Sequence, residues 1–138
     1  MSLPDRRLDV VRRHMDSENR LAFDETLATF AHPHYELVAT GTVYDGTDEV
    51  MGYYTASRTA FPDQRNEVHS IRHAEDAVFV EFDLLGTHRG EFLGVAPTGR
   101  EFRCRMAAVF EFESGTDRIV SERVYFDSGT ILGQLGIT

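Results

Sequence analysis

The chain has 138 residues, 41% of them hydrophobic, and its 23 acidic residues against 14 basic ones give a formal net charge of −9. This length suits one domain with its own core, residues 1–138, and the acidic balance argues against the basic face that nucleic-acid binding needs. A single cysteine, Cys104, excludes an internal disulfide, and no group of Cys and His residues has the spacing of zinc ligands.

The N-terminal part of the sequence predicts a helix from Asp5 to Asn19. Its apolar residues Leu8, Val11 and Met15 recur at spacings of three and four, which is typical of a helix with one buried face. We expect the arginines of this segment, and His14, at the surface.

Two further helices are predicted before the pattern changes. Asp24 precedes ETLATF and is expected to cap a short helix that Pro33 ends. Residues 46–58, GTDEVMGYYTASR, form the third helix, whose buried stripe is Val50, Met51 and Tyr54. Two short strands, YELVA and TVYD, are expected between these helices, on either side of Gly41.

Beyond residue 63 the apolar residues alternate, which predicts strands. We expect strands at 65–74, 77–91, 101–114 and 119–126, and a short final helix at 128–135. Three helices followed by an antiparallel meander indicate an α+β domain, with the helices on one face of a curved sheet.

The turn after residue 114 predicts which side chains of the last two strands share a face. If Ser114 lies opposite Asp117, the inner, apolar face contains Cys104, Met106, Ala108, Phe110, Phe112, Ile119, Ser121, Arg123, Tyr125 and Asp127. The outer face then contains Arg103, Arg105, Glu111 and Glu122. In this register Cys104 lies opposite Asp127, and Met106 lies opposite Tyr125.

The hairpin that turns at residues 75–76 is paired in the same way. Its inner face is predicted to contain His69, Ile71, His73, Val78, Val80, Phe82, Leu84 and His88, and its outer face Arg72, Glu81 and Asp83. We therefore expect His69 and His88 to point inward.

Several motifs, taken in order, resemble a known family. AFPD (60–63), GTHRGEFLG (86–94), PTGR (97–100), and YFD followed by QLG (125–127, 134–136) are similar to the SnoaL-like polyketide cyclases or ester cyclases of the nuclear transport factor 2-like superfamily. The resemblance implies a cone-shaped α+β fold, in which a curved antiparallel or mixed sheet wraps around three helices and leaves an internal pocket. It also implies a homodimer through the outer face of the sheet, and an acid/base aspartate on the last strand that acts without cofactor or metal. Asp127 matches that position.

The predicted site leaves several roles open. Asp127 either caps the helix that follows it or acts as acid/base in a dry pocket. His88 is the second catalytic candidate, and the alternative is a buried histidine bonded to a backbone carbonyl. Arg123 either forms an ion pair or meets an anionic ligand. The residues expected to bind substrate are Tyr53, Phe61, His69, Phe82, Cys104, Met106, Arg123 and Tyr125.

These predictions favour a protein that binds an apolar, carbonyl-bearing small molecule and abstracts a proton next to the carbonyl, leading to cyclisation or isomerisation. The alternatives are a noncatalytic ligand-binding domain and a dimeric interaction module of the same fold. No apolar run is long enough for a membrane span or a signal peptide, so we expect a cytoplasmic protein. All 14 basic residues are arginines, which is typical of a GC-rich genome or of a salt-adapted cytoplasm.

Overall fold

Four helices and one six-stranded sheet form residues 1–137, the part of the chain that the computed structural model describes. The elements are α1 (Leu3–Asn19), α2 (Phe23–Ala28), β1 (His34–Leu37), β2 (Thr42–Asp45), α3 (Thr47–Ala60), β3 (Arg65–Ala74), β4 (Ala77–Thr87), β5 (Glu101–Phe112), β6 (Ile119–Tyr125) and α4 (Ser128–Leu135). None of these helices has the length and hydropathy to cross a membrane.

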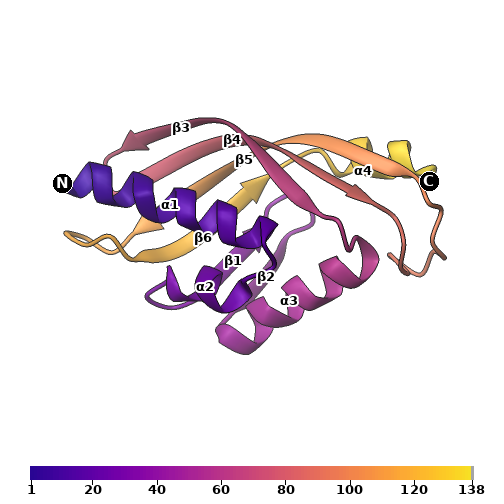
Figure 1. Cartoon of the computed structure of the whole chain (residues 1–138), viewed down its shortest axis with the longest axis horizontal. Coiled ribbons are helices and arrows are strands. Elements are labelled where there is room, and N and C mark those ends of the chain that lie inside the picture. Colours follow the sequence, from indigo (N-terminus) through magenta and orange to yellow (C-terminus); the bar gives the residue numbers. More distant parts are fainter. Residues whose placement is uncertain (138) are drawn as a thin grey trace.

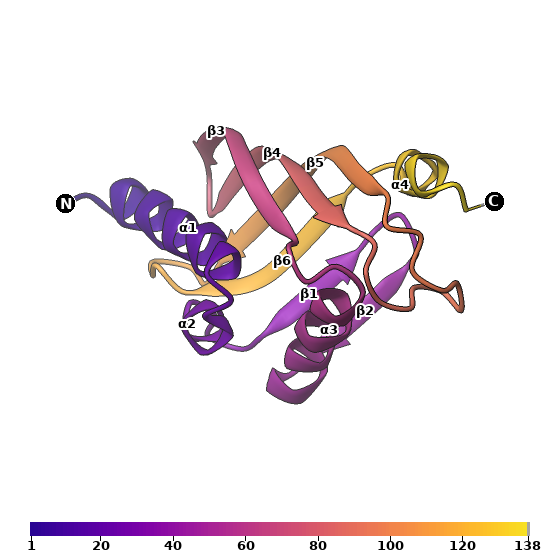
Figure 2. The ribbon, with the colours of Figure 1, turned by 45° about the vertical axis from the view of Figure 1, so that its right-hand side comes forward.

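The sheet has the order β2-β1-β6-β5-β4-β3 and is mixed, because β1 runs parallel to β6 while the other neighbours are antiparallel. Helices α1, α2 and α3 gather on one side of the curved sheet, and the short helix α4 lies at its far end beside β5 (Figures 1 and 2). The predicted α+β fold, with three N-terminal helices and a short C-terminal helix, is confirmed.

Helix α1 begins as its sequence dictates but buries more than its apolar residues. The side chain of Ser2 accepts a hydrogen bond from the Asp5 N–H at 3.2 Å, and Pro4 occupies the first turn, where no N–H is needed. Val11 and Met15 are buried, and so is His14, which has no exposed surface. The expectation of a surface position for His14 was wrong, because this residue lies three positions after Val11 on the same face of the helix.

Several predicted element ends differ by a few residues, and two of them have a clear structural reason. Helix α2 begins at Phe23 after Ala22, which makes no side-chain capping bond, so Asp24 lies in the first turn. Strand β4 ends at Thr87 because the Arg89 and Gly90 N–H groups leave the ladder and donate to the Ala60 carbonyl. Gly90 is required here, since a Cβ at this position would lie 2.1 Å from the Thr59 carbonyl oxygen.

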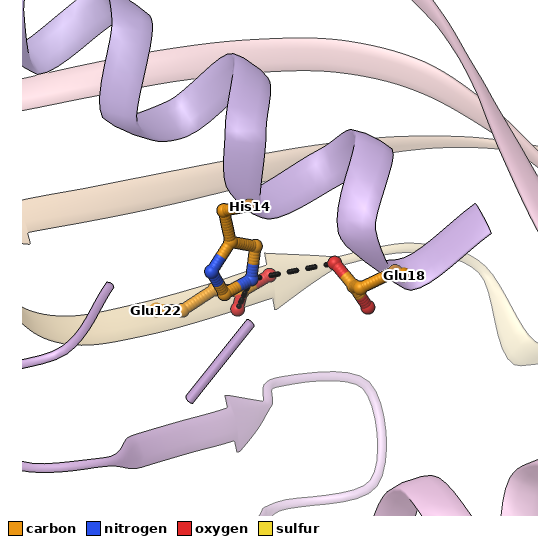
Figure 3. Close-up of side chains that lie close together, drawn as sticks. All are labelled: His14, Glu18 and Glu122. Atoms are coloured by element: carbon orange, nitrogen blue, oxygen red, sulfur yellow. Dashed lines mark ion pairs between the residues drawn. The ribbon is translucent and has the colours of Figure 1, made fainter. Parts of the chain in front are cut away.

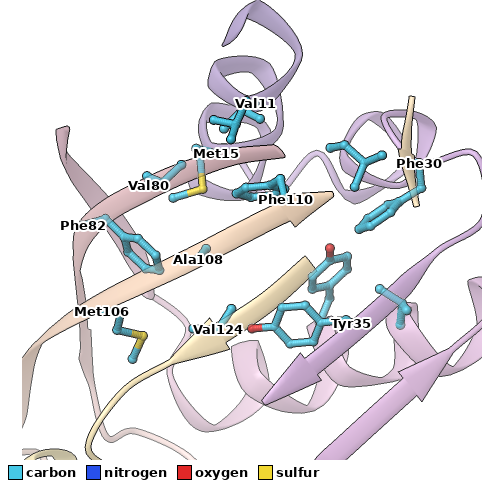
Figure 4. Packing of buried hydrophobic residues seen from close by; sticks show 14 of the residues in the cluster. Val11, Met15, Phe30, Tyr35, Val80, Phe82, Met106, Ala108, Phe110 and Val124 are labelled. Carbon is cyan, nitrogen blue, oxygen red and sulfur yellow. The ribbon is translucent and has the colours of Figure 1, made fainter. Parts of the chain in front are cut away.

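The core lies between α1 and the concave face of the sheet. Figure 4 shows Val11 and Met15 of α1 facing Val80 of β4 and Phe110 of β5. Val11, Val80 and Phe110 are completely buried. Burying a side chain of this size contributes about 1.5–3 kcal/mol, so this layer fixes α1 on the sheet.

A bulge in β3 changes the predicted face of His69. The pairing follows the expected register as far as Ser70 opposite Glu81, and then shifts so that Val68, not His69, lies opposite Phe82. His69 is the extra residue and points outward, where its Nε2 lies 3.1 Å from Oδ2 of Asp83 and its side chain is 41% exposed. The prediction that His69 lines the interior was wrong, since a one-residue shift moves a side chain to the other face.

A second bulge inverts most of β6. Phe112 lies opposite Ile119 as predicted, but the next pair is Glu111 with Ser121, so Val120 is the extra residue. Val124 and Glu122 consequently face the interior, with exposed fractions of 3% and 4%.

The same shift turns Arg123 and Tyr125 outward. Nη1 of Arg123 lies 2.7 Å from Oε1 of Glu111 on the outer face, and Tyr125 is 44% exposed. The predicted inner positions of Arg123 and Tyr125, and the predicted outer position of Glu122, were therefore wrong. Arg123 forms an ion pair, one of the two roles left open for it.

Candidate functional site

A pocket of about 550 Å³ lies at the concave face, between α3, the N-terminal strands and α4. Its wall is largely apolar and aromatic, and includes Tyr35, Tyr44, Tyr53, Phe61, Leu84, Phe92, Phe102, Met106, Val124, Phe126 and Ile131. This volume is in the range of small-molecule binding sites. Three of the predicted substrate-binding residues, Tyr53, Phe61 and Met106, line it.

Tyrosine side chains supply hydrogen-bonding groups in this wall. The ring of Tyr53 lies 4.9 Å from that of Tyr35 and 5.0 Å from that of Tyr44. Burial raises the pKa of Tyr35 well above its ordinary value, and burial also raises the pKa of Tyr53. Both hydroxyls therefore stay protonated at neutral pH and can donate a hydrogen bond to a ligand oxygen.

Next to the pocket lies a buried group of charged residues that sequence patterns had not indicated. Nε2 of His14 lies 3.0 Å from Oε1 of Glu122 on β6 and 3.3 Å from Oε1 of Glu18 on α1 (Figure 3). Glu122 adjoins the pocket wall, because it pairs with Tyr35 across the sheet and lies two residues before Val124. We call His14, Glu18 and Glu122 the histidine–glutamate cluster.

Hydrogen bonds behind the cluster fix the imidazole of His14. The Thr29 hydroxyl donates to the Thr26 carbonyl oxygen at 2.6 Å, so its oxygen accepts from Nδ1 of His14 at 2.8 Å. This bond places a proton on Nδ1 and leaves Nε2 directed at the carboxylates. On the other side, Nη2 of Arg58 lies 3.8 Å from Oε2 of Glu18.

Burial and charge set the protonation of the cluster. Burial by itself would lower the pKa of His14, but the nearby negative charges of Glu122 and then of Glu18 outweigh it and raise the pKa to about 10. Burial raises the pKa of Glu122, an effect that the charge of His14 opposes. The imidazole therefore carries a positive charge at neutral pH.

His88 lies inside the protein, on the side that its sequence position predicted. Its Nδ1 accepts a hydrogen bond from the Thr98 N–H at 3.2 Å, so the neutral ring carries its proton on Nε2. Nε2 is buried and has no hydrogen-bonding partner within residues 1–137. The rings of Phe61 and Phe92, both in the pocket wall, lie 5.7 and 6.2 Å from the imidazole.

Asp127 caps α4. Its Oδ1 accepts from the Gly129 N–H at 3.2 Å and its Oδ2 accepts from the Thr130 hydroxyl at 3.0 Å. Asp127 is exposed. Its two neighbours in the sequence, Phe126 and Ser128, line the pocket, but Asp127 is not part of the pocket wall that the described residues form. Of the two roles considered for Asp127, the geometry provides the cap, while its catalytic role stays a prediction.

Two further predicted site residues pack in the core. Phe82 and Cys104 are 5% and 2% exposed and face the interior as predicted, but the pocket wall, as far as the described residues form it, is built from others. The Cys104 thiol lies 3.9 Å from the Asp127 carbonyl oxygen, so these two residues are neighbours, although the Asp127 carboxylate points to the helix.

One signal in the sequence could have located part of the histidine–glutamate cluster but was not used. His14 and Glu18 are four residues apart, so they share one face of α1, and that face is the one marked by Val11 and Met15. Glu122 could not be found in this way, because its inward position depends on the bulge at Val120.

Comparison with known proteins identifies the family of this chain. The model of the SnoaL-like polyketide cyclases matches residues 8–135. No curated protein sequence matches the chain.

Solved structures share the fold. IdmH of Streptomyces antibioticus, suggested to be a polyketide cyclase, is 28% identical with a TM-score of 0.79, over 95% of this chain and 99% of that one. A protein of Jannaschia sp. CCS1, suggested to be a SnoaL-like polyketide cyclase, is 17% identical with a TM-score of 0.86, over 100% and 96% of the chains. A protein of Catenulispora acidiphila with a ketosteroid isomerase-like fold, solved in complex with trimethylamine, is 18% identical with a TM-score of 0.80, over 94% and 93% of the chains.

Proposed function

Because this chain belongs to the SnoaL-like polyketide cyclase family, we propose that it binds an apolar, carbonyl-bearing small molecule in its concave pocket. The observation that carries the proposal is the pocket itself, about 550 Å³ of space with aromatic and aliphatic walls. An interaction module would fill this space with its own side chains. A pocket of this size and composition instead favours a ligand of drug-like dimensions.

Polar groups at the pocket fit a carbonyl oxygen. The protonated hydroxyls of Tyr35 and Tyr53 lie in the wall, whereas His88 is completely buried behind Phe61 and Phe92 and does not line the pocket. Each hydroxyl is a donor in a largely apolar surrounding, where a hydrogen bond to a carbonyl oxygen is stronger than in water. The hydroxyls of Tyr35 and Tyr53 would orient the ligand, while the apolar wall would provide most of the affinity.

The second candidate is catalysis on the same ligand, in which the proton next to the carbonyl would pass to the carboxylate of Asp127, the acid/base that the family resemblance implies. The unpartnered Nε2–H of His88 favours it, because a donor of this kind stabilises the oxyanion that develops as the proton leaves. The capping role of Asp127 favours the noncatalytic function, because its carboxylate is occupied by the Gly129 N–H and the Thr130 hydroxyl.

Binding is tested by filling the pocket. Thr55 and Ala56 are neighbouring exposed residues of α3, and of the two it is Ala56 that lines the pocket. We expect Ala56→Trp to weaken the binding of a fluorescent naphthalene probe at least tenfold and Thr55→Trp to leave it unchanged. Equal binding by the two variants would show that the probe, and by inference the ligand, does not occupy this pocket.

Catalysis is tested separately by proton exchange. An apolar ketone such as 1-tetralone in D2O reports proton abstraction next to its carbonyl, followed by NMR. Exchange above the buffer rate that falls in His88→Gln supports an enzyme with His88 as oxyanion donor, and a further fall in Asp127→Asn would restore the catalytic role of Asp127. Probe binding without exchange supports the noncatalytic domain.

We also propose that two copies associate through the outer face of the sheet. This face exposes Phe79 and Tyr125, and both border a shallow groove on β3–β6. Gel filtration at low and high salt tests the dimer, and a monomer at both salt concentrations would refute it.

A further inference from the structure

Three metal-ligating side chains converge in the interior from two separate elements (Figure 3). His14 and Glu18 come from successive turns of α1, and Glu122 comes from β6. One ligand atom of each residue lies within 4.8 Å of the ligand atoms of the other two. The cluster is enclosed, because the side chains of His14, Glu18 and Glu122 are 0%, 16% and 5% exposed.

The atoms at the centre of this cluster lack aligned hydrogen bonds. Nε2 of His14 is completely buried and lies 3.0 Å from Glu122 and 3.3 Å from Glu18, yet in residues 1–137 it finds no hydrogen-bonding partner of good geometry. The same holds for Oε1 of Glu122. Nε2 is therefore close to both carboxylates but aligned with neither, which is unusual for buried polar atoms.

We propose that His14, Glu18 and Glu122 form a binding site for a divalent first-row transition metal ion, with Zn²⁺ and Co²⁺ as its probes. Ligands bound at about 2.0–2.2 Å in tetrahedral or octahedral geometry lie roughly 2.9–3.5 Å from one another. The separations of 3.0 and 3.3 Å from Nε2 fall in this interval. One imidazole nitrogen with two carboxylate oxygens is a donor set that suits such ions.

The residues around the cluster have the arrangement expected behind metal ligands. Nδ1 of His14 donates to Thr29, which holds the ring so that Nε2 faces the carboxylates. Nη2 of Arg58 lies 3.8 Å from the second oxygen of Glu18 and balances part of its charge.

The histidine–glutamate cluster lies next to the pocket. Glu122 pairs with Tyr35, which lines the pocket, so an ion held by the cluster would lie just behind the pocket wall. The hydroxyl of Tyr54 is a further buried group without a partner among the described residues, and the charges of Glu18 and Glu122 act on it. The proposal rests on the geometry of the cluster alone and does not depend on the ligand of the pocket.

Metal titration tests the proposal without a substrate. The full chain is treated with a chelator, exchanged into chelator-free buffer and titrated with Zn²⁺ by calorimetry, and with Co²⁺ by visible absorption, which reports ligand geometry. We expect one ion per chain. Glu18→Gln and Glu122→Gln should each weaken binding more than tenfold, and Thr29→Val should weaken it about 10–100-fold.

A surface chelate is the main competitor, and the chain offers a matched control for it. His32 and His34 both contact Oδ1 of Asp45 on the surface, at 3.0 and 2.9 Å. The variant His32→Gln/His34→Gln should bind Zn²⁺ as the wild type does. Circular dichroism establishes that the Gln variants fold, and Glu18→Gln is the safest of them because Glu18 is the least buried ligand.

Three results would overturn the proposal. The first is the absence of Zn²⁺ and Co²⁺ binding by the wild type. The second is binding that persists unchanged in a folded Glu18→Gln or Glu122→Gln variant. The third is binding that disappears in His32→Gln/His34→Gln, which would assign the ion to the surface residues.

Discussion

Removing His14 from the metal-free protein should destabilise the fold strongly. His14→Leu keeps most of the buried volume but leaves Glu122, 4% exposed, without the imidazole that lies 3.0 Å from it. Breaking a buried ion pair on one side costs about 3–5 kcal/mol. With an unfolding entropy of about 2.1 cal/mol/K per residue over 138 residues, this corresponds to a fall in Tm of about 10–17 °C. The loss of stability cannot exceed the cost of protonating the unpaired Glu122 carboxylate, because the variant can relieve the buried charge in that way.

Urea denaturation in the presence of a chelator measures this effect at pH 7. The double variant His14→Leu/Glu122→Leu provides the control, because it removes both charges and replaces them with apolar groups. It should be more stable than His14→Leu by more than about 1 kcal/mol, since a buried pair replaced as a whole costs little. A loss below about 1 kcal/mol in His14→Leu, or a double variant less stable than the single one, would refute the assignment of a buried ion pair.

Three further predictions concern the stability of the fold around the pocket. Asp127→Ala should lower stability by about 0.5–2 kcal/mol while Asp127→Asn, an equally good cap, should have a much smaller effect in thermal unfolding. Gly90→Ala should lower Tm markedly, because its Cβ would meet the Thr59 carbonyl oxygen at 2.1 Å, whereas Gly94→Ala has free space but a strained φ of 76° and serves as the comparison. Hydrogen bonds from Arg105 and then Arg103 hold the pKa of Asp83 far below its ordinary 3.8. Its contribution is therefore fully present above about pH 4 and decreases progressively as pH falls further, so the difference between the urea midpoints of wild type and Asp83→Asn should be largest at pH 7 and shrink steadily below pH 4.

The positions of the helices and strands along the chain follow from local patterns in the sequence. The three- and four-residue spacing of Leu8, Val11 and Met15 requires nothing beyond α1 itself, and the alternation after residue 63 is equally local. The alternation also placed Met106 on the inner face, and Met106 does line the pocket, as do Tyr53 and Phe61, which were predicted to bind substrate. Predictions of this kind succeed because each depends on a few neighbouring residues.

The strand register could not be predicted from local patterns in this way, because it depends on where bulges occur. One extra residue in β3 turns His69 to the outer face, and one in β6 turns Arg123 and Tyr125 outward. Neither His69 nor Val120 carries a residue-type signal for a bulge, such as a glycine. The composition of the site therefore depended on two positions that only the packed sheet reveals.

The packing of β6 explains why its bulge forms. Ile119 and Val124 are an odd number of residues apart, so a regular strand would place them on opposite faces. The bulge at Val120 allows both to be buried, with exposed fractions of 0% and 3%, and each contributes about 1.5–3 kcal/mol.

The bulge also sends Arg123 to the surface, where it pairs with Glu111, and carries Glu122 inward as its necessary consequence. An isolated buried carboxylate would cancel the gain from Ile119 and Val124. His14 offsets this penalty from the facing helix, 3.0 Å away. The burial of both Ile119 and Val124 and the formation of the charged cluster next to the pocket are thus two results of the same single-residue shift.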